Sequence, residues 1–236
     1  MPVLKRFYSG ATERSCGEGF EVALDGRPVR TPLGVPLVVP TRALGAAIAE
    51  EWRAQAAEIV FSAMPLMGIA NAAIDRARAD PPTFRASVAA YGRNDLLCQR
   101  AEEPDELVRR QAAAWDSWLD WAVERHGARL ATGTGVMPIA QPVEATAALD
   151  VAVAALDEWG LAAAGVAVAA SGSLVLALAV VEGRLAGEEA LALAALEELW
   201  QNERWGVDRE AVARREGIAA DLAAAARFAR LARARD

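Results

Sequence analysis

The sequence predicts an α+β protein in which a small N-terminal β-rich domain precedes a larger all-helical domain. Within the first forty residues, short apolar runs are separated by Gly, Pro and Asp, a pattern typical of strands and hairpins. From Thr41 onward, apolar residues recur every three or four positions, which is typical of helices. We expect the β-rich domain to comprise residues 1–62 and the helical domain residues 63–236.

The β-rich part is expected to contain three or four short strands. Phe20–Leu24 alternates between apolar and polar residues, and Asp25 and Gly26 follow as a pair that favours a tight hairpin turn. Further strands are expected over Arg27–Thr31 and Leu37–Val39, the latter ending before a proline. Asp25 and Gly26 are therefore assigned a structural role.

The first helix is expected to begin after Thr41, whose hydroxyl suits the N-cap position. Leu44, Ile48, Trp52 and Ile59 fall on one apolar stripe of the segment that follows. Trp52 is therefore expected to be buried and to have a structural role.

Three later segments have recognisable helix boundaries. One covers 105–126 and stops at Gly127, and another begins after Pro142 and ends at Gly160. A third, over 188–205, ends at Gly206, after which Asp208 is expected to cap the last helix. Gly206 is thus a structural residue.

The uncharged segment Leu161–Val181 is about as long as the roughly 20 residues that span a bilayer. It is rich in Ala, is interrupted by Gly and Ser, and has neither an aromatic belt nor basic flanks. We therefore expect a buried helix or helix pair and no membrane insertion.

The charge balance argues against a nucleic-acid partner. The chain has a net charge of -7, opposite to the basic surface that phosphate backbones attract. An acidic surface fits either a protein partner or simple solubility. Two distant cysteines without a secretory signal favour a reducing compartment.

Residues for catalysis or metal binding are sparse. The one histidine, His126, is expected to help cap a helix end, and Cys16 and Cys98 lack metal-ligand spacing. The glycine pairs at 17–19 and 133–135 lack the rest of a phosphate-binding motif and are interpreted as turns. Neighbouring glutamates on a helix do not face each other. We expect no cofactor, metal, small-molecule substrate or catalytic residue. An enzyme that uses Asp or Glu together with an externally supplied metal stays an alternative interpretation.

Seven tryptophans stand out because Trp is common both in cores and at binding hot spots. Trp121 and Trp205 lie off the main apolar stripes of their helices, so they are candidates for a partner surface. Core packing is the alternative role for each of them.

An ordered series of short strings spans nearly the whole chain. It comprises Lys5-Arg6-Phe7-Tyr8, Leu24-Asp25-Gly26-Arg27-Pro28-Val29-Arg30-Thr31-Pro32, Ala47-Ile48-Ala49-Glu50-Glu51-Trp52, Met64-Pro65-Leu66, Ala73-Ile74-Asp75, Asp95-Leu96-Leu97-Cys98, Gln111, Trp115-Asp116, Trp121, Gly172-Ser173 and the closing Trp200-Gln201-x-Glu203-x-Trp205-Gly206-x-Asp208. This series resembles the ATP synthase F(1) alpha-subunit assembly chaperones, the type known in mitochondria as F(1) assembly factor 2. Met67 and Ala72 stand where the family often has Thr, and Phe61 replaces a usual Pro, which bears on local loop geometry.

The resemblance implies a non-catalytic chaperone that binds unassembled alpha subunit and prevents its aggregation before it pairs with beta. Within the closing motif we expect Glu203 to make a charged contact, Trp205 to anchor the partner and Asp208 to cap a helix. Helix termination and packing are the alternative roles.

A general protein-binding or holdase module with another client is the alternative function. The family-like start lies close to Met1 and leaves no room for a presequence, which favours the cytoplasm of a bacterium. Eukaryotic relatives would act in the mitochondrial matrix, and a processed mitochondrial form would be the exception.

Overall fold

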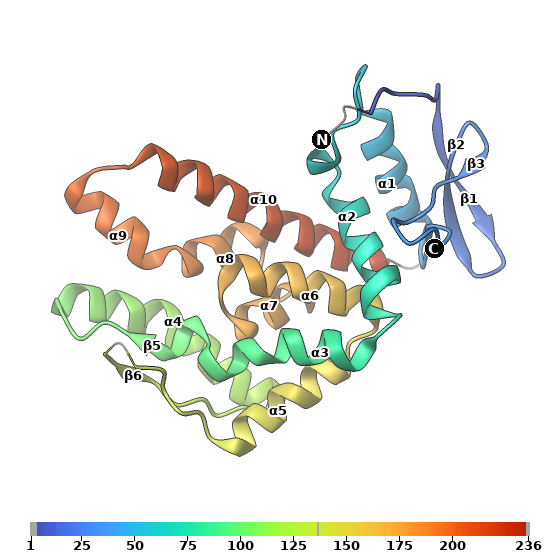
Figure 1. Ribbon diagram of the computed structural model, residues 1–236. Coiled ribbons are helices and arrows are strands. Elements are labelled where there is room, and N and C mark those ends of the chain that lie inside the picture. The colour runs from blue at the N-terminus through green and yellow to red at the C-terminus, as the bar shows by residue number, and fades with distance from the viewer. Residues whose placement is uncertain (1–3, 136, 235–236) are drawn as a thin grey trace.

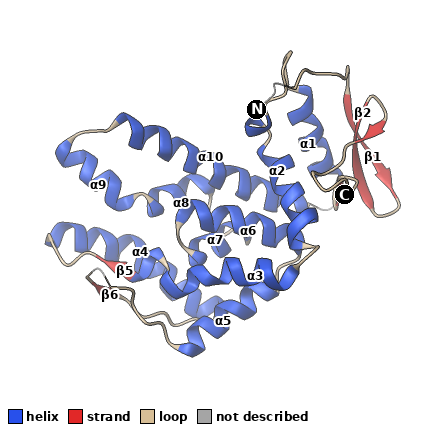
Figure 2. Cartoon of the chain, viewed as in Figure 1, coloured by secondary structure: helices blue, strands red, loops and turns tan. Residues whose placement is uncertain are grey.

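A small antiparallel sheet packs at one end of a helical body in the computed structural model (Figures 1 and 2), which describes residues 4–135 and 137–234. The sheet comes first in the chain and the helices follow it, so the predicted α+β class is confirmed. The sheet's strands are β1 (Ala11–Cys16), β2 (Gly19–Leu24), β3 (Arg27–Pro28) and β4 (Val38–Val39).

Strand β2 lies at the centre of this sheet and pairs antiparallel with each of the other three. Its register with β1 sets Ala11 opposite Leu24 and Cys16 opposite Gly19. Strand β1 was absent from the sequence prediction because its residues are mostly polar and barely alternate. The hydrogen bonds to β2 fix it instead.

The turn between β2 and β3 adopts the left-handed backbone that its residues favour. Asp25 has φ 47° and Gly26 has φ 80°, as a two-residue hairpin turn requires. The Asp25 carboxylate also accepts hydrogen bonds from the backbone N–H groups of Ser9 (2.9 Å) and Gly10 (2.8 Å). These bonds lower the pKa of Asp25.

Helix α1 (Arg42–Arg53) covers the sheet with one apolar stripe. Thr41 Oγ1 accepts the N–H of Leu44 at 3.1 Å, so the predicted N-cap is confirmed. Ile48 and Trp52 are buried on the stripe. Placing Ile59 on the same stripe was wrong because α1 ends at Arg53. Ile59 is buried in the segment after the helix, where its N–H donates to the carbonyl of Leu4 at 2.8 Å.

The remaining α-helices form the body of the molecule. They are α2 (Pro65–Ala72), α3 (Pro81–Ala89), α4 (Asp105–His126), α5 (Val143–Ala154), α6 (Glu158–Ser171), α7 (Leu174–Val181), α8 (Gly187–Ala194), α9 (Leu196–Trp205) and α10 (Arg209–Ala232). Short 3-10 turns lie at Phe61–Ala63, Ala90–Asn94 and Leu96–Cys98, and a π-helical turn at Ala73–Ala77 continues α2.

Helices α6 and α7 form the centre of the body, and α10 and α3 pack around them (Figure 1). The uncharged segment Leu161–Val181 forms most of α6 and all of α7, and most of its side chains are buried, so the predicted buried helix pair is confirmed. Gly172, with φ 71°, makes the break between the two helices. In the described part of the chain, no helix is both long and apolar enough to cross a bilayer.

Two predicted helix boundaries and one predicted turn were wrong. Gly160 does not end a helix; its N–H donates to Asp157 Oδ1 at 2.7 Å in the first turn of α6, and α5 ends earlier, at Ala154. The segment 188–205 is two helices that meet at Ala195. Gly133 and Thr134 form a short strand, β6, parallel to β5 (Gln99–Arg100), because the chain returns beside that segment.

A continuous apolar core joins the sheet to the helices, running from Tyr8 in the N-terminal segment to Ala229 in α10. The hydroxyl of Thr41 also donates to the carbonyl of Leu231 near the end of α10, at 2.7 Å. The division into domains at 62 and 63 stays a prediction.

Candidate partner-binding surface

The connection between α9 and α10 is a sharp reversal at the end of the body farthest from the sheet (Figure 1). Gly206 ends α9 with φ 89° and donates its N–H to the carbonyl of Asn202 at 3.1 Å. Asp208 begins α10 by accepting the N–H of Glu210 at 3.1 Å. Because only Gly adopts such a backbone readily, the reversal is encoded locally.

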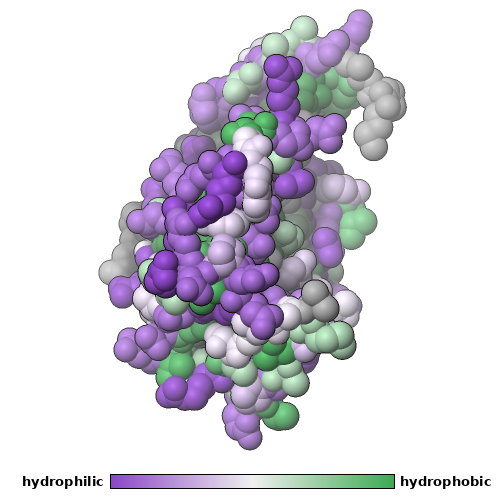
Figure 3. Space-filling model, turned by 90° about the vertical axis from the view of Figure 1, so that its left-hand side faces the viewer, coloured by the Kyte–Doolittle hydropathy of each residue, from purple (hydrophilic) through white to green (hydrophobic). Residues whose placement is uncertain are grey.

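This reversal leaves Trp205 outside the core, with 73% of its surface exposed. Its ring packs edge-to-face on Trp200, with the centroids 5.6 Å apart, while Trp200 itself is buried. The neighbouring Val207 is also exposed. The end of the molecule that carries α9 is mostly hydrophilic, with separate hydrophobic spots (Figure 3).

Glu203 lies in a chain of ion pairs between α9 and α4. Its Oε2 is 2.8 Å from Nη1 of Arg110, whose Nη2 is 3.0 Å from Oε1 of Glu106. Arg204 pairs with the same Glu106. The bond to Glu203 raises the pKa of the Arg110 guanidinium, which therefore stays charged.

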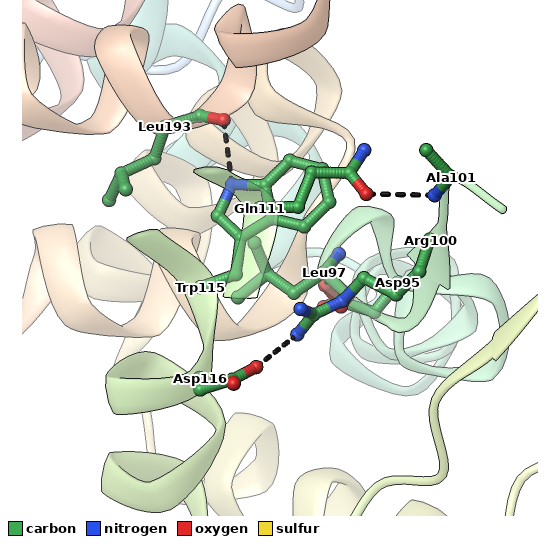
Figure 4. Close-up of polar contacts among 8 residues, drawn as sticks. All are labelled: Asp95, Leu97, Arg100, Ala101, Gln111, Trp115, Asp116 and Leu193. Carbon is green, nitrogen blue, oxygen red and sulfur yellow. Dashed lines mark hydrogen bonds and ion pairs between the residues drawn. The ribbon is translucent and has the colours of Figure 1, made fainter. Parts of the chain in front are cut away.

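Helix α4 is held in position by side chains that hydrogen-bond to the backbone of other segments (Figure 4). Gln111 Oε1 accepts the N–H of Ala101 at 2.8 Å, and the indole N–H of Trp115 donates to the carbonyl of Leu193 at 3.0 Å. Both side chains are buried. The exposed ion pairs of α4 thus project from a fixed support.

Asp95 connects the segment that precedes α4 to helix α7 through hydrogen bonds. Its two carboxylate oxygens accept the N–H groups of Leu97 at 3.0 Å and Val175 at 3.1 Å. Asp95 is only 1% exposed, and this burial raises the pKa of its carboxyl group, although the hydrogen bonds lower it in part.

Trp121 lies on α4 but apart from the other three predicted contact residues. It is eleven residues beyond Arg110, or about 16 Å along the helix. Its half-buried ring packs edge-to-face on Trp118 and His126. The structure therefore gathers Glu203, Trp205 and Asp208 at one reversal and leaves Trp121 towards the other end of α4.

The predicted capping role of His126 was wrong. Gly127, with φ 74°, closes α4 by donating its N–H to the carbonyl of Val123 at 2.9 Å. The His126 imidazole packs on Trp121 instead, with Nε2 3.5 Å from Glu182 Oε1. Burial lowers its pKa, so this imidazole is neutral near pH 7.

Residues suited to catalysis are not gathered here. Among residues 4–135 and 137–234, no group of three or more His, Cys, Asp or Glu residues could hold a metal ion. Cys98 is buried, which raises the pKa of its thiol to about 12. Such a thiol is a poor nucleophile.

The sequence did not point to Glu106, Arg110 or Arg204 as members of this surface. The spacing of Glu106 and Arg110, four residues apart on one helix, was the available local signal. The contacts from α4 to α9 join residues more than 90 positions apart.

The family model described as ATP12 chaperone protein matches residues 5–123, which is more than half of the chain. This protein belongs to the ATP12 chaperone family. The match covers the sheet, α1 to α3 and most of α4. The family identity makes the protein a non-catalytic chaperone of ATP synthase assembly.

Solved structures extend the similarity over the whole fold. Atp12 from Paracoccus denitrificans is 41% identical, with a TM-score of 0.91 and coverage of 98% of this chain and 99% of that one. A mutant of the same Paracoccus protein, carrying Lys in place of Asp, is also 41% identical, with a TM-score of 0.91 and coverage of 98% of each chain. A candidate chaperone from Agrobacterium tumefaciens is 42% identical, with a TM-score of 0.91 and coverage of 97% and 86%.

Proposed function

We propose that this protein binds the unassembled alpha subunit of the ATP synthase catalytic head, in the bacterial cytoplasm, and prevents its aggregation before alpha pairs with beta. Membership of the ATP12 chaperone family supports assembly of this enzyme as the process. An alpha subunit without beta exposes apolar surface that assembly later buries, and such surface drives aggregation.

The observation that carries the proposal is the exposed Trp205 beside the charged side chain of Glu203 at the α9–α10 reversal. An indole with 73% of its surface exposed buries little apolar area in the folded monomer beyond its contact with Trp200, whereas it supplies large apolar area to an interface. The ion pairs around it suit the polar rim of an exchangeable interface. In this proposal Trp205 anchors alpha, Glu203 makes a charged contact and Asp208 fixes the reversal.

Trp121 is proposed as a second, separate contact. Its distance along α4 from Arg110 means that the client would extend over α4 to reach it. A flat contact of that length agrees with a standard interface of about 800 Å² per partner.

The proposal is tested by following light scattering as denatured alpha subunit is diluted into buffer with this protein. We expect suppression of alpha aggregation near equal molar amounts and no suppression with an unrelated aggregating protein. Equal suppression of both would instead support the general holdase function. If this protein suppresses the aggregation of neither alpha nor the unrelated protein, the proposed activity is wrong.

A further inference from the structure

A groove lies at the sheet end of the molecule. Figure 1 shows the elements that form it at the end opposite to α9. It encloses about 860 Å³, within the range of roughly 300–1,000 Å³ that is common for ligand sites. Its walls come from the N-terminal segment at Phe7 and Tyr8, the hairpin over residues 24–32, and α1 and α2.

Four aromatic rings line this groove in an unbroken series. Phe7 packs on Tyr8, Tyr8 on Trp52 and Trp52 on Phe61, each edge-to-face, with centroids 5.5, 5.5 and 6.4 Å apart. Tyr8 and Trp52 are buried, while Phe7 is 67% and Phe61 is 54% exposed. Two large exposed aromatic side chains at the mouth of an apolar groove are typical of a binding site.

The polar groups of the groove fit a polypeptide backbone. Trp52 Nε1 and Asn71 Oδ1 are shielded from solvent and find no hydrogen-bond partner within the described part of the chain. They are one donor and one acceptor, and a buried polar atom without a partner costs free energy. Both residues line the groove, so the C=O and N–H of a peptide that enters it would supply the missing partners.

One wall of the groove also offers a strand edge. Strand β3 is at the end of the strand order in its sheet, and Arg27 to Pro32, which include β3, line the groove. An extended peptide can add to such an edge through backbone hydrogen bonds.

The rim of the groove is cationic although the chain as a whole carries a net charge of -7. Arg27 and Arg30 are exposed lining residues, and Arg27 makes no ion pair with any described residue. The one lining carboxylate, Asp25, accepts the N–H groups of Ser9 and Gly10 and stays ionised, so the two guanidinium groups leave the lining with a net positive charge. The charge therefore favours an occupant that carries carboxylates.

We infer that this groove binds an extended, unfolded polypeptide segment in which apolar side chains alternate with acidic ones. The apolar side chains enter between the aromatic rings, and the acidic ones pair with Arg27 and Arg30. The inference does not depend on the client being the alpha subunit, because the groove and the α9–α10 reversal are separate surfaces.

Two glycines allow a matched test. A Cβ added at Gly68, which lines the groove on α2, meets nothing within 4 Å, so Gly68→Phe adds an aromatic side chain at the groove wall. Gly217, in α10 and outside the groove, is equally open, so Gly217→Phe makes the same change elsewhere. Arg27→Glu reverses the charge of the rim.

The probe is a fluorescein-labelled nine-residue peptide that alternates Leu or Phe with Glu, and binding to the full chain is followed by fluorescence anisotropy. We expect saturable binding with a Kd below about 100 μM. Gly68→Phe should weaken it at least about tenfold, Arg27→Glu should weaken it and favour the same peptide with Lys for Glu, and Gly217→Phe should leave it unchanged.

Absence of saturable binding, or equal binding by the Gly68→Phe variant, would overturn the inference. So would equal weakening by Gly217→Phe. Light scattering of the free protein adds one more outcome: a dimer that Gly68→Phe dissociates would assign the groove to a second copy of this chain, and not to a peptide. Because none of these measurements uses the alpha subunit, their failure leaves the proposed function untouched.

Discussion

Arg110 of α4 and Glu203 of α9 form an ion pair in which Nη1 and Oε2 lie 2.8 Å apart, although 93 positions separate them in the chain. The pair ties the last turn of α9 to the first turns of α4, beside the exposed Trp205. Both side chains are about half exposed, so solvent screens the pair and it adds little to the stability of the fold. Because the pair lies next to Trp205, the candidate anchor, we expect it to matter more for partner binding than for stability.

Charge reversal at Glu203 is expected to weaken alpha binding without unfolding the protein. Glu203→Lys replaces the carboxylate of the proposed charged contact by a third cation beside Arg110 and Arg204, while the exposed position keeps the change in stability below about 1 kcal/mol. Pull-down of alpha and thermal unfolding measure the two effects. Glu216→Lys, with the same charge change on an exposed part of α10, is the control.

Arg110→Ala separates a direct contact by Glu203 from an indirect one. This variant breaks the same ion pair from the other side and leaves Glu203 free to bind alpha. We expect Arg110→Ala to retain most alpha binding. If it loses as much as Glu203→Lys does, then Glu203 acts by positioning α9, and the proposed contact is wrong.

The two tryptophans of α9, Trp200 and Trp205, which pack edge-to-face, should respond differently to truncation. Trp205→Ala removes an exposed ring and is expected to cost less than about 1 kcal/mol of stability while strongly weakening alpha binding. Trp200→Ala empties a buried site and should cost about 3–5 kcal/mol. Urea denaturation and pull-down of both variants provide the comparison. Normal binding by Trp205→Ala would rule out the anchor role.

Trp52→Arg is expected to destabilise the protein by several kcal/mol. Trp52 is 5% exposed and its ring packs edge-to-face on Tyr8 and Phe61, so an arginine there would place a charge in the apolar core. Trp52→Phe keeps an apolar ring and should cost clearly less. An unchanged thermal midpoint for Trp52→Arg would contradict the structural role.

Asp95 should make stability fall as the pH rises. Because burial raises the pKa of its carboxyl in the folded state, the folded protein keeps this proton to a higher pH than the unfolded chain does. The stability that it contributes is therefore present below the ordinary carboxyl pKa and is lost as the pH rises through the raised value. Asp95→Asn removes this dependence, so the difference in unfolding free energy between wild type and variant should shrink with rising pH. A constant difference would refute the shift.

Much of the fold was predictable because its signals are local. Thr41 begins α1, Gly127 closes α4, and Asp25 with Gly26 makes the hairpin turn, each through chemistry confined to a few residues. The errors arose where tertiary contacts decide. Strand β1 is polar and depends on pairing with β2, and the break at Ala195 has no Gly or Pro to announce it.

The candidate surface was predictable only in part for the same reason. The exposure of Trp205 follows from its place off the apolar stripe of its helix and from Gly206 beside it. The ion pairs of Glu203 and Arg204 depend on how α4 packs against α9, and no local pattern encodes that packing. The groove beside Trp52 likewise brings together segments from the N-terminus, the hairpin and α2.

Co-purification with separately expressed alpha and beta subunits tests the central claim most directly. We predict that tagged wild-type protein retains soluble alpha and not beta, and that Glu203→Lys, but not Glu216→Lys, loses alpha. Retention of beta in place of alpha, or of neither subunit by a folded protein, would contradict the proposed client.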